Sequence, residues 1–458
     1  MKKLTLSLLF LIGFYNVWGQ DYNLQYPTNA LRYYGQDIDA GSSKYTAMAG
    51  ASGALGGDIS STEQNPAGLG VAISSEVSIT AGVDAYKNKS TFGSVATTKD
   101  NLFDIRQASG AFVINNPGSN WNRFVIGVNF LNEQLDNEVI LGENTNVSYS
   151  FDNNQNYVMN AYYDGVSGYK TKFSVNFGTS YNDKLYLGAN INFHETNYTN
   201  SLLYRDRNVA NNALEYFDVN GSPYAEVGRG FSFGLGVLGK VNQNIRLGAA
   251  FHSPVWYTVD EEYHALTNSG SYEFFVSDYK LQTGARAVGS IGFVLGKSFA
   301  LDVDYTHHFN KMLDFSNGSF SGEKQFVDDQ VNNTSEVRVG GEYRYNNFRA
   351  RAGYAFVQSP MKDVTLITNH TDADGDYTVT TDFDQMYIGD ANKLSFGLGY
   401  DFGGFYIDAT YRHVNQKYTM PLTGYLVGQT SDFGLPSTYS ADVKNNRNLY
   451  MLTLGWQF

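Results

Sequence analysis

The sequence predicts an all-β transmembrane barrel of fourteen antiparallel strands, with a small N-terminal hatch (plug) inside the lumen. Three observations lead to this prediction. Short segments of alternating polarity run from residue 74 to residue 458, their number is even, and the connectors between them are alternately short and long. An even number of strands with tight turns at one end and long loops at the other is typical of bacterial outer-membrane barrels.

The composition agrees with a strand-rich chain and excludes several classes of function. The 458 residues include 47 Gly, 35 Tyr and 31 Phe, but only 8 Pro and no Cys. Without cysteine there is no disulfide, no thiolate metal site and no lipid-anchored N-terminal Cys. The formal net charge of -13 argues against nucleic acid as a partner, because binding phosphates requires a basic surface.

Residues 1–19 have the pattern of a signal peptide. Lys2 and Lys3 precede an apolar stretch over 4–15, and Gly19 is a small residue suited to cleavage. The mature chain is therefore expected to leave the cytoplasm. Beyond this segment no run approaches the roughly 18 apolar residues of a membrane helix, which leaves a soluble secreted β-protein or an outer-membrane barrel. The alternation favours the barrel, which we assign to residues 74–458.

Period-two patterning and connector length together define the strands. Short connectors are expected to face the periplasm, so both chain termini and residues 21–44 are expected at that end. The predicted strands are 74–87, 107–115, 122–135, 171–181, 184–204, 230–240, 244–260, 284–296, 298–309, 334–345, 347–357, 392–402, 404–415 and 448–458. The long connectors are 88–106, 136–170, 205–229, 261–283, 310–333, 358–391 and 416–447.

The last strand carries a strong membrane signal. Alternate residues are apolar and end on an aromatic carboxyl-terminal residue, which resembles the signal read by the barrel assembly machinery. The residues expected to face lipid and to form this assembly signal are Tyr450, Leu452, Leu454, Trp456 and Phe458.

Residues 20–73 are predicted to form the hatch. Their second half is rich in Gly and small residues, and its centre is Asn65-Pro66-Ala67-Gly68. Pro66 fixes its own φ near -65°, and an Asn before Pro favours a turn in which its side chain bonds the backbone. A barrel of about fourteen strands encloses a lumen that leaks unless it is blocked, and this segment directly precedes the first strand.

The segment AMAGASGALGGDISSTEQNPAGLG and hairpins such as GRGFSFGLGVLGKVNQNIRLGAAFHSP resemble the FadL/TodX family of outer-membrane transporters. The resemblance covers nearly the whole mature chain and is most specific at Asn65-Pro66-Ala67. It implies passive uptake of long-chain fatty acids or other hydrophobic compounds. It also implies that a hatch rearrangement, with a kink in one strand, opens a lateral path to the bilayer. Asn65, Pro66, Ala67 and Gly68 would then be gating residues, and we expect Asn65→Ala to reduce uptake without preventing barrel assembly.

Apolar residues in the long connectors are candidates for an entry groove, although strand ends and an aromatic girdle would give the same pattern. The expected partners are a hydrophobic small molecule, outer-membrane lipid and lipopolysaccharide, and the barrel assembly machinery, with no cofactor. The candidate groove residues are Leu202, Leu203, Phe217, Trp256, Phe274 and Phe275.

The other groups of polar residues give no strong indication of a metal site or a catalytic site. The adjacent His307 and His308 point to opposite faces of a strand and cannot chelate together. Asp372, Asp374 and Asp376 resemble the start of a calcium loop, but its bidentate Glu is missing, so they form at most a weak Ca²⁺ candidate. No nucleophile elbow or triad spacing suggests an enzyme. The main alternative is a structural or adhesive surface protein acting through its long extracellular loops, whose function would survive deletion of residues 21–73.

Overall fold

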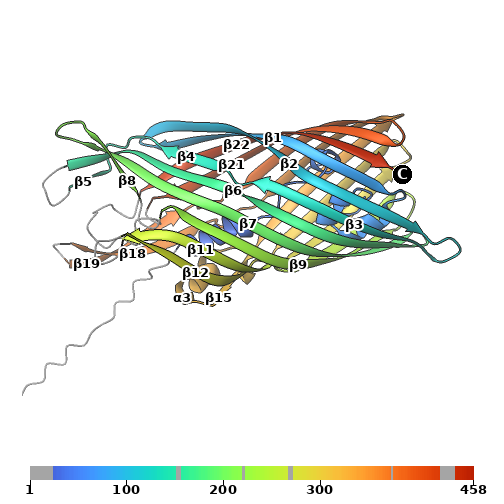
Figure 1. The fold of residues 1–458 in the computed structure, drawn as a ribbon, viewed down its shortest axis with the longest axis horizontal. Helices are drawn as coiled ribbons and strands as arrows, with labels where there is room; N and C mark the ends of the chain where they lie inside the picture. Colours follow the sequence, from blue (N-terminus) through green and yellow to red (C-terminus); the bar gives the residue numbers. More distant parts are fainter. Residues whose placement is uncertain (1–23, 151–155, 219–221, 267–271, 373–374, 423–438) are drawn as a thin grey trace, which may run out of the picture.

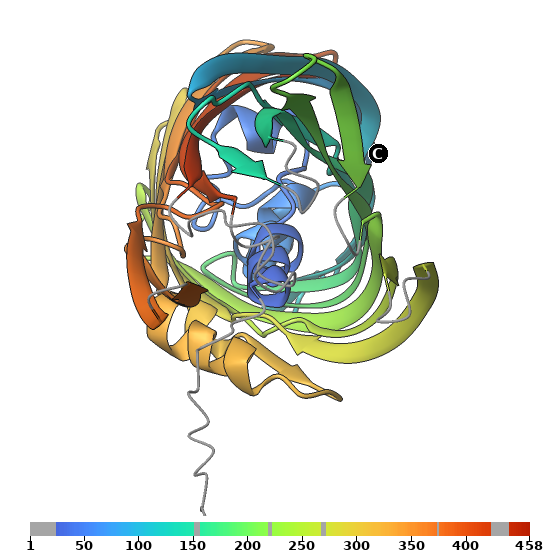
Figure 2. The same cartoon turned by 90° about the vertical axis from the view of Figure 1, so that its left-hand side faces the viewer.

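The computed structural model describes residues 24–150, 156–218, 222–266, 272–372, 375–422 and 439–458. The predicted signal peptide lies outside this range. The described chain forms a closed antiparallel barrel of fourteen staves around its own N-terminal segment (Figures 1 and 2). The seam is the pairing of the first and last strands, which runs from Glu76 opposite Gln457 to Thr91 opposite Asp442.

We call each of the fourteen positions around the barrel wall a stave. Eleven staves are formed by one strand, and three are formed by two consecutive strands with a short break between them. The single strands are β1 (Glu76–Phe92), β2 (Ser94–Asn115), β3 (Trp121–Gln134), β6 (Asn156–Tyr181), β7 (Leu185–Asn208), β9 (Tyr224–Lys240), β16 (Thr334–Tyr345), β17 (Phe348–Val357), β20 (Ala391–Asp401), β21 (Phe405–Pro421) and β22 (Ser440–Gln457). The interrupted staves are β10 (Ile245–His252) with β11 (Trp256–Leu266), β12 (Tyr272–Gln282) with β13 (Arg286–Leu295), and β14 (Phe299–His308) with β15 (Asp314–Ser316).

Shorter elements occupy the end of the barrel with the long loops. These are β4 (Asn137–Leu141), β5 (Ser148–Ser150), β8 (Leu214–Asp218), η4 (Asn310–Met312), the helix α3 (Ser321–Gln330) and the separate hairpin of β18 (Val364–Asp372) and β19 (Gly375–Phe383).

The fourteen predicted strands are confirmed, but several boundaries were wrong. β2 begins at Ser94 and joins β1 through a tight turn at Gly93, so the predicted long connector 88–106 is mostly strand. β6 likewise begins fifteen residues earlier than expected, at Asn156. The predicted strand 244–260 is broken at 253–255. Strand extensions outside the apolar belt were missed because their outward side chains are polar, as Lys87 and Lys89 are, and the apolar alternation ends there.

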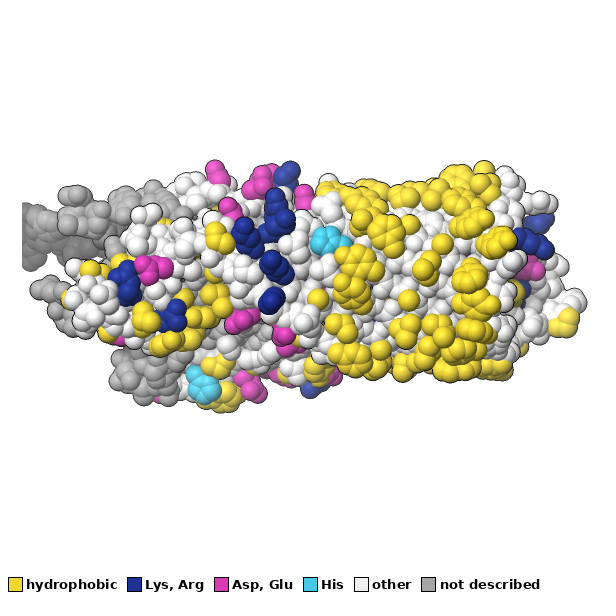
Figure 3. Space-filling view, turned by 90° about the horizontal axis from the view of Figure 1, so that it is seen from above, with side chains coloured by type: hydrophobic (Ala, Val, Ile, Leu, Met, Phe, Trp, Pro, Cys, Tyr) yellow, Lys and Arg dark blue, Asp and Glu magenta, His cyan; other side chains and the backbone are white. Residues whose placement is uncertain are grey.

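A belt of exposed apolar side chains surrounds the half of the barrel nearer the short turns (Figure 3). The last strand contributes as predicted. Tyr450, Leu452, Trp456 and Phe458 are exposed and Leu454 is partly exposed, whereas Thr453 between them is fully buried. Among the described residues no helix is long and apolar enough to cross a membrane.

The N-terminal segment lies inside the barrel, where Figure 2 shows it in blue. Its elements are α1 (Gln25–Asn29), η1 (Ala30–Tyr34), α2 (Ser43–Ala47), η2 (Ile59–Glu63) and η3 (Pro66–Val71). Its last residues return to the short-turn end, where the Ser75 amide donates to the Phe458 carbonyl at 3.1 Å. We refer to the described part of this segment, residues 24–75, as the hatch.

The start of the hatch differs from the sequence-based expectation. Residues 24–34 lie in the half nearer the long loops, not at the short-turn end, since Tyr26 packs edge-on against Phe320 beside α3 and bonds Glu261 of β11. The physical reason is apolar burial. Leu24, Leu31 and Tyr34 join the large cluster of buried side chains in that half of the lumen.

Candidate hatch and lateral opening

The side chain of Asn65 ties the hatch to itself and to the wall. Its Oδ1 accepts from the Ala67 amide at 3.0 Å, which starts the turn of η3 with Pro66 in the first position. Its Nδ2 donates to the Gly53 carbonyl at 2.8 Å and to the Val237 carbonyl of β9 at 3.0 Å. The expected bond to its own backbone is therefore present, and the amide in addition links two parts of the hatch to the barrel. Gly68 closes the same turn by donating to the Asn65 carbonyl.

Lumen-facing glycines let the hatch backbone touch the wall. A Cβ at Gly188 of β7 would lie 2.2 Å from the carbonyl carbon of Pro66, and one at Gly236 of β9 would lie 2.0 Å from Oδ1 of Asn65. Gly353 of β17 lies equally close to the backbone after α2. Hatch and wall are thus in direct backbone contact on several sides of the lumen.

Two buried carboxylates of β14 hold the loop between α2 and η2. Oδ2 of Asp304 accepts from the amides of Ser52 and Gly53 at 3.0 and 3.2 Å. Two residues along the strand, Oδ2 of Asp302 accepts from the next two amides, at 3.1 and 3.0 Å. Four consecutive backbone amides are therefore satisfied by two wall side chains, although the sequence analysis did not single out either aspartate.

Asp39 of the hatch is held by basic side chains of the wall. Its carboxylate lies 2.9 Å from Nη1 of Arg412 and 3.2 Å from Nζ of Lys393, and Nη2 of Arg106 donates to its carbonyl at 2.8 Å. Burial alone would raise the pKa of Asp39, but Arg412, Lys393 and Arg106 outweigh it and hold that pKa below its ordinary value. Asp39 is therefore ionised at neutral pH and links the hatch to the wall through these contacts. We refer to it with its partners Arg412, Lys393 and Arg106 as the Asp39 clamp.

The wall next to Asp39 is incomplete, because the third stave bends inward. β3 pairs with β2 only from Arg123 opposite Asn115 to Leu131 opposite Gln107. Its continuation, β4, remains paired with β6 but lies inside the lumen, where the inward-facing Asn88 of β1 donates to the Glu138 carbonyl at 2.7 Å. Ser90 and Thr98 donate to the same short strand. β4 thus crosses the inner face of β1 and β2 instead of continuing the sheet.

The bend leaves one edge of β2 without a strand. Over residues 94–106, β2 has β1 as its only strand partner within the described ranges. Phe103 and Ile105 point outward there and are 65% and 41% exposed, so the free edge lies at the level of the apolar belt. On the inner side of the same strand, Arg106 carries the hydrogen bond to Asp39. The hatch therefore contacts the inner side of the strand that borders this interruption of the wall.

The half of the lumen nearer the long loops is lined mainly by apolar side chains, and we refer to it as the chamber. Val139 and Leu141 of β4 belong to the same buried cluster as Leu24, Leu31 and Leu202, so the apolar side chains of this region extend to the inward bend. The chamber is not wholly apolar, since it also holds carboxyl groups that are bonded by tyrosines.

Two carboxyl groups, those of Glu226 and Glu261, are buried in this chamber. Tyr224 donates to Glu261 at 2.7 Å and also to Glu226, Tyr279 donates to Glu226 at 2.9 Å, and Tyr26 donates to Glu261 at 3.0 Å. A ligand in the chamber would therefore meet apolar surface together with hydrogen-bonding tyrosine and glutamate groups.

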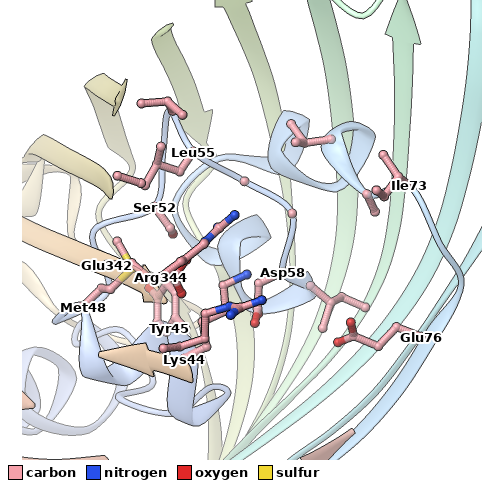
Figure 4. A pocket seen from close by; sticks show the side chains of 18 of the residues that line it. Lys44, Tyr45, Met48, Ser52, Leu55, Asp58, Ile73, Glu76, Glu342 and Arg344 are labelled. Atoms are coloured by element: carbon pink, nitrogen blue, oxygen red, sulfur yellow. The ribbon is translucent and has the colours of Figure 1, made fainter. Parts of the chain in front are cut away.

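A cavity of about 790 Å³ lies on the other side of the hatch, at the short-turn end (Figure 4). Charged side chains of both signs line it, from the hatch (Lys44, Asp58) and from the wall (Glu76, Glu342, Arg344). Apolar side chains, among them Met48, Leu55 and Ile73, line it as well, so this vestibule is only partly polar.

The candidate groove residues do not come together. Leu202 is buried in the lumen cluster, whereas its neighbour Leu203 lies on the opposite face of β7. Trp256 and Phe274 are exposed on the outside, and Phe275 stacks on Tyr263 at the rim. The side chain of Phe217 lies outside the described residues. Alternation along each strand explains the separation, because consecutive side chains point to opposite faces.

The acidic candidate for Ca²⁺ falls on the hairpin of β18 and β19. The backbone of Asp372 pairs with Gly375 and that of Asp376 with Thr371, whereas Asp374 and the side chains of the other two lie outside what the structure describes. Over the described residues there is no group of three or more His, Asp or Glu side chains that could hold a metal ion.

Comparison with known proteins gives structural matches only. No protein-family model and no curated protein sequence matches the chain. The toluene transporter TodX of P. putida superposes with a TM-score of 0.57 at 13% identity, over 92% of this chain and 99% of the other. A Pseudomonas aeruginosa FadL homologue gives 0.59 at 14%, over 93% and 100%. The chain has the FadL/TodX fold. The Ralstonia pickettii toluene transporter TbuX, with a TM-score of 0.54 at 15% identity over 92% and 99% of the two chains, shares this fold.

Proposed function

We propose that the chain is a passive channel of the bacterial outer membrane for hydrophobic molecules, with long-chain fatty acids the first candidates. A ligand enters the apolar chamber from the long-loop end and leaves sideways into the bilayer once the hatch rearranges. The fold supports this proposal, because the proteins that share it include toluene transporters and a FadL homologue. No energy source is required, because each methylene moved from water to an apolar phase gains about 0.8 kcal/mol.

The observation that carries the proposal is the inward bend of the third stave beside the Asp39 clamp. Straight passage down the lumen would bring an apolar molecule into the vestibule, where charged side chains of both signs stand among the apolar ones, so that the molecule would gain less there than in the bilayer. The free edge of β2 instead faces the apolar belt through Phe103 and Ile105. The sideways route is therefore the one of the two that ends in a wholly apolar phase. Asn65, Pro66, Ala67 and Gly68 would act here as hinge and anchor of the hatch.

A disulfide that locks the hatch tests this proposal directly, because the natural chain has no cysteine. A Cβ at Gly292 of β13 would lie 3.2 Å from the Cβ of Ala54, which is close to the separation of about 3.8 Å found in disulfides. We expect Ala54→Cys/Gly292→Cys to take up radiolabelled hexadecanoate or toluene in reductant and to lose uptake when oxidised. Each single variant should be insensitive to reductant.

The choice of two labelled compounds addresses the ligand class. Because two carboxyl groups, those of Glu226 and Glu261, are buried in the chamber, the comparison tests whether a ligand carboxylate is accepted there, and uptake of toluene without hexadecanoate would assign the channel to uncharged compounds. Equal uptake by locked and reduced protein would refute hatch movement. Uptake of neither compound above that of cells lacking the protein would refute the channel and favour a role on the cell surface.

A further inference from the structure

Five lysines form one outward-facing patch on four adjacent strands. Lys87 and Lys89 lie on β1, Lys99 on β2, Lys444 on β22 and Lys417 on β21, and all five are exposed. Figure 3, which looks onto this side of the barrel, shows Lys and Arg side chains gathered beside the apolar belt, towards the long loops. In a chain with a net charge of -13, such a concentration of lysines is locally distinct. We refer to these five residues as the lysine patch.

The register places like charges directly opposite one another. Lys87 pairs with Lys99, Lys89 pairs with Lys444, and Lys444 pairs with Lys417. Side chains in directly opposed positions have Cβ atoms about 5 Å apart, and like charges there destabilise a sheet. Three such pairs in one patch therefore cost stability unless an anion lies between them.

The described chain does not supply that anion. None of the five lysines forms an ion pair with a described residue. On these strand segments the exposed acidic residues are Asp100, next to Lys99, and Asp442, two residues beyond Lys444. The patch keeps an excess of positive charge after both are counted.

The height of the patch on the barrel points to the source of the anion. Lys87 is four residues beyond Val83, which pairs with Tyr450 and with the strongly exposed Phe103 at the upper edge of the apolar belt. With about 3.3 Å per residue and a tilt of about 40°, these lysines stand roughly 10 to 15 Å beyond that edge. Lipid head groups lie at this level, and extracellular orientation of the long loops makes them those of the outer leaflet.

We propose that the lysine patch binds the phosphate groups of the outer-leaflet glycolipid, lipid A. The primary amines would take the place of the divalent cations that otherwise bridge neighbouring lipid phosphates. The strands from β2 to β21 would then carry a bound lipid on the side that includes the barrel seam. The free edge of β2 lies on the same strand as Lys99, so this lipid would stand beside the proposed lateral opening. Lipid binding itself does not depend on the transport function.

The test compares two triple variants with equal loss of charge. Lys89→Gln/Lys417→Gln/Lys444→Gln removes two of the three opposed pairs and weakens the patch. Lys184→Gln/Lys280→Gln/Lys297→Gln removes three exposed lysines elsewhere and serves as control. Binding to purified full-length protein in nanodiscs is measured with bisphosphorylated lipid A and with its dephosphorylated form, in EDTA at low salt.

Each lysine near an anionic surface contributes about 1 kcal/mol, so we expect the patch variant to bind phosphorylated lipid A roughly 100-fold more weakly than the natural chain. The control variant should bind like the natural chain, and added salt should weaken binding. Without lipid the patch variant should unfold at the same temperature as the natural chain or higher, because repulsion is relieved. Phosphorylated lipid A should then raise the unfolding temperature of the natural chain and of the control, but not that of the patch variant.

Equal binding of phosphorylated and dephosphorylated lipid A would overturn the proposal, as would equal weakening in both triple variants. A patch variant that unfolds at a lower temperature than the natural chain without lipid would show that the lysines stabilise the sheet themselves, and would also overturn it.

Discussion

Replacing Asn65 by Ala should loosen the hatch while leaving the barrel intact. The substitution removes the acceptor for the Ala67 amide and the donor to the carbonyls of Gly53 and Val237. Asn65 is fully buried, so water does not replace these bonds without local opening. The hydrogen bonds between the wall strands are not affected, because only one of the three lost bonds reaches the wall. That bond is the one from Asn65 to the Val237 carbonyl.

Each net hydrogen bond is worth about 1 kcal/mol, and a buried partner left unsatisfied costs about 1 to 3 kcal/mol. Three lost bonds therefore amount to about 3 kcal/mol or more in the free energy that keeps the hatch closed. Since about 1.4 kcal/mol corresponds to a factor of ten, the equilibrium constant for hatch opening should rise by roughly 100-fold.

Hydrogen exchange followed by mass spectrometry reads this change on hatch peptides and barrel peptides in one experiment. We expect exchange over 59–71 to accelerate by roughly that factor, while peptides from β7 and β9 stay protected. Asn120→Ala, at an exposed turn, is the matched control. Hatch exchange within threefold of the natural chain would refute the reasoning. Lower substrate uptake by Asn65→Ala stays a separate prediction, and a failure of barrel assembly would show that the residue serves folding alone.

The other predictions concern the contacts of the hatch with the wall. Gly236→Ala should displace the hatch and raise ion conductance in planar bilayers, because its Cβ would lie 2.0 Å from Asn65, whereas Gly239→Ala, with nothing within 4 Å, should change nothing. Asp302→Ala removes the acceptor of two hatch amides and should cost about 3 kcal/mol of hatch stability, measured by hydrogen exchange; unchanged protection would contradict it. The lowered pKa of Asp39 means that its ion pairs persist at neutral pH. Their contribution to hatch closure begins to decline below the ordinary carboxyl pKa of about 4 and is lost only as the pH approaches the lowered value, so conductance should rise well below pH 4 and stay constant between pH 6 and 8.

The barrel could be predicted from the sequence because lipid imposes period-two apolar patterning on every stave, as the last strand shows with Tyr450, Leu452 and Trp456 exposed. Above the apolar belt the same strands continue with polar outward faces, and the patterning that reveals a strand disappears. For this reason the sequence analysis did not predict the beginning of β2.

The site was predicted only where local chemistry determines it. Asn65-Pro66 specifies a turn by itself, and the turn is present. The hydrogen bonds and ion pairs between the wall and the hatch join residues far apart in the chain, such as Asp302 with Leu55 and Arg412 with Asp39. One signal was available, since Asp302 and Asp304 place two acids on one face of a strand whose other face meets lipid. The inward bend of β3 depends on pairing partners, which no single segment reveals.

The position of residues 24–75 inside a closed sheet constrains how the protein is built. The hatch immediately precedes β1, and β1 forms the seam with β22, the last strand of the chain. Hatch residues touch staves around the whole circumference, from Thr179 of β6 to Thr453 of β22. After closure of the cylinder, a folded plug would have to enter through one end and only then form bonds in all these directions. We therefore expect the hatch to be in place before the first and last strands meet, so that the wall closes around it during biogenesis.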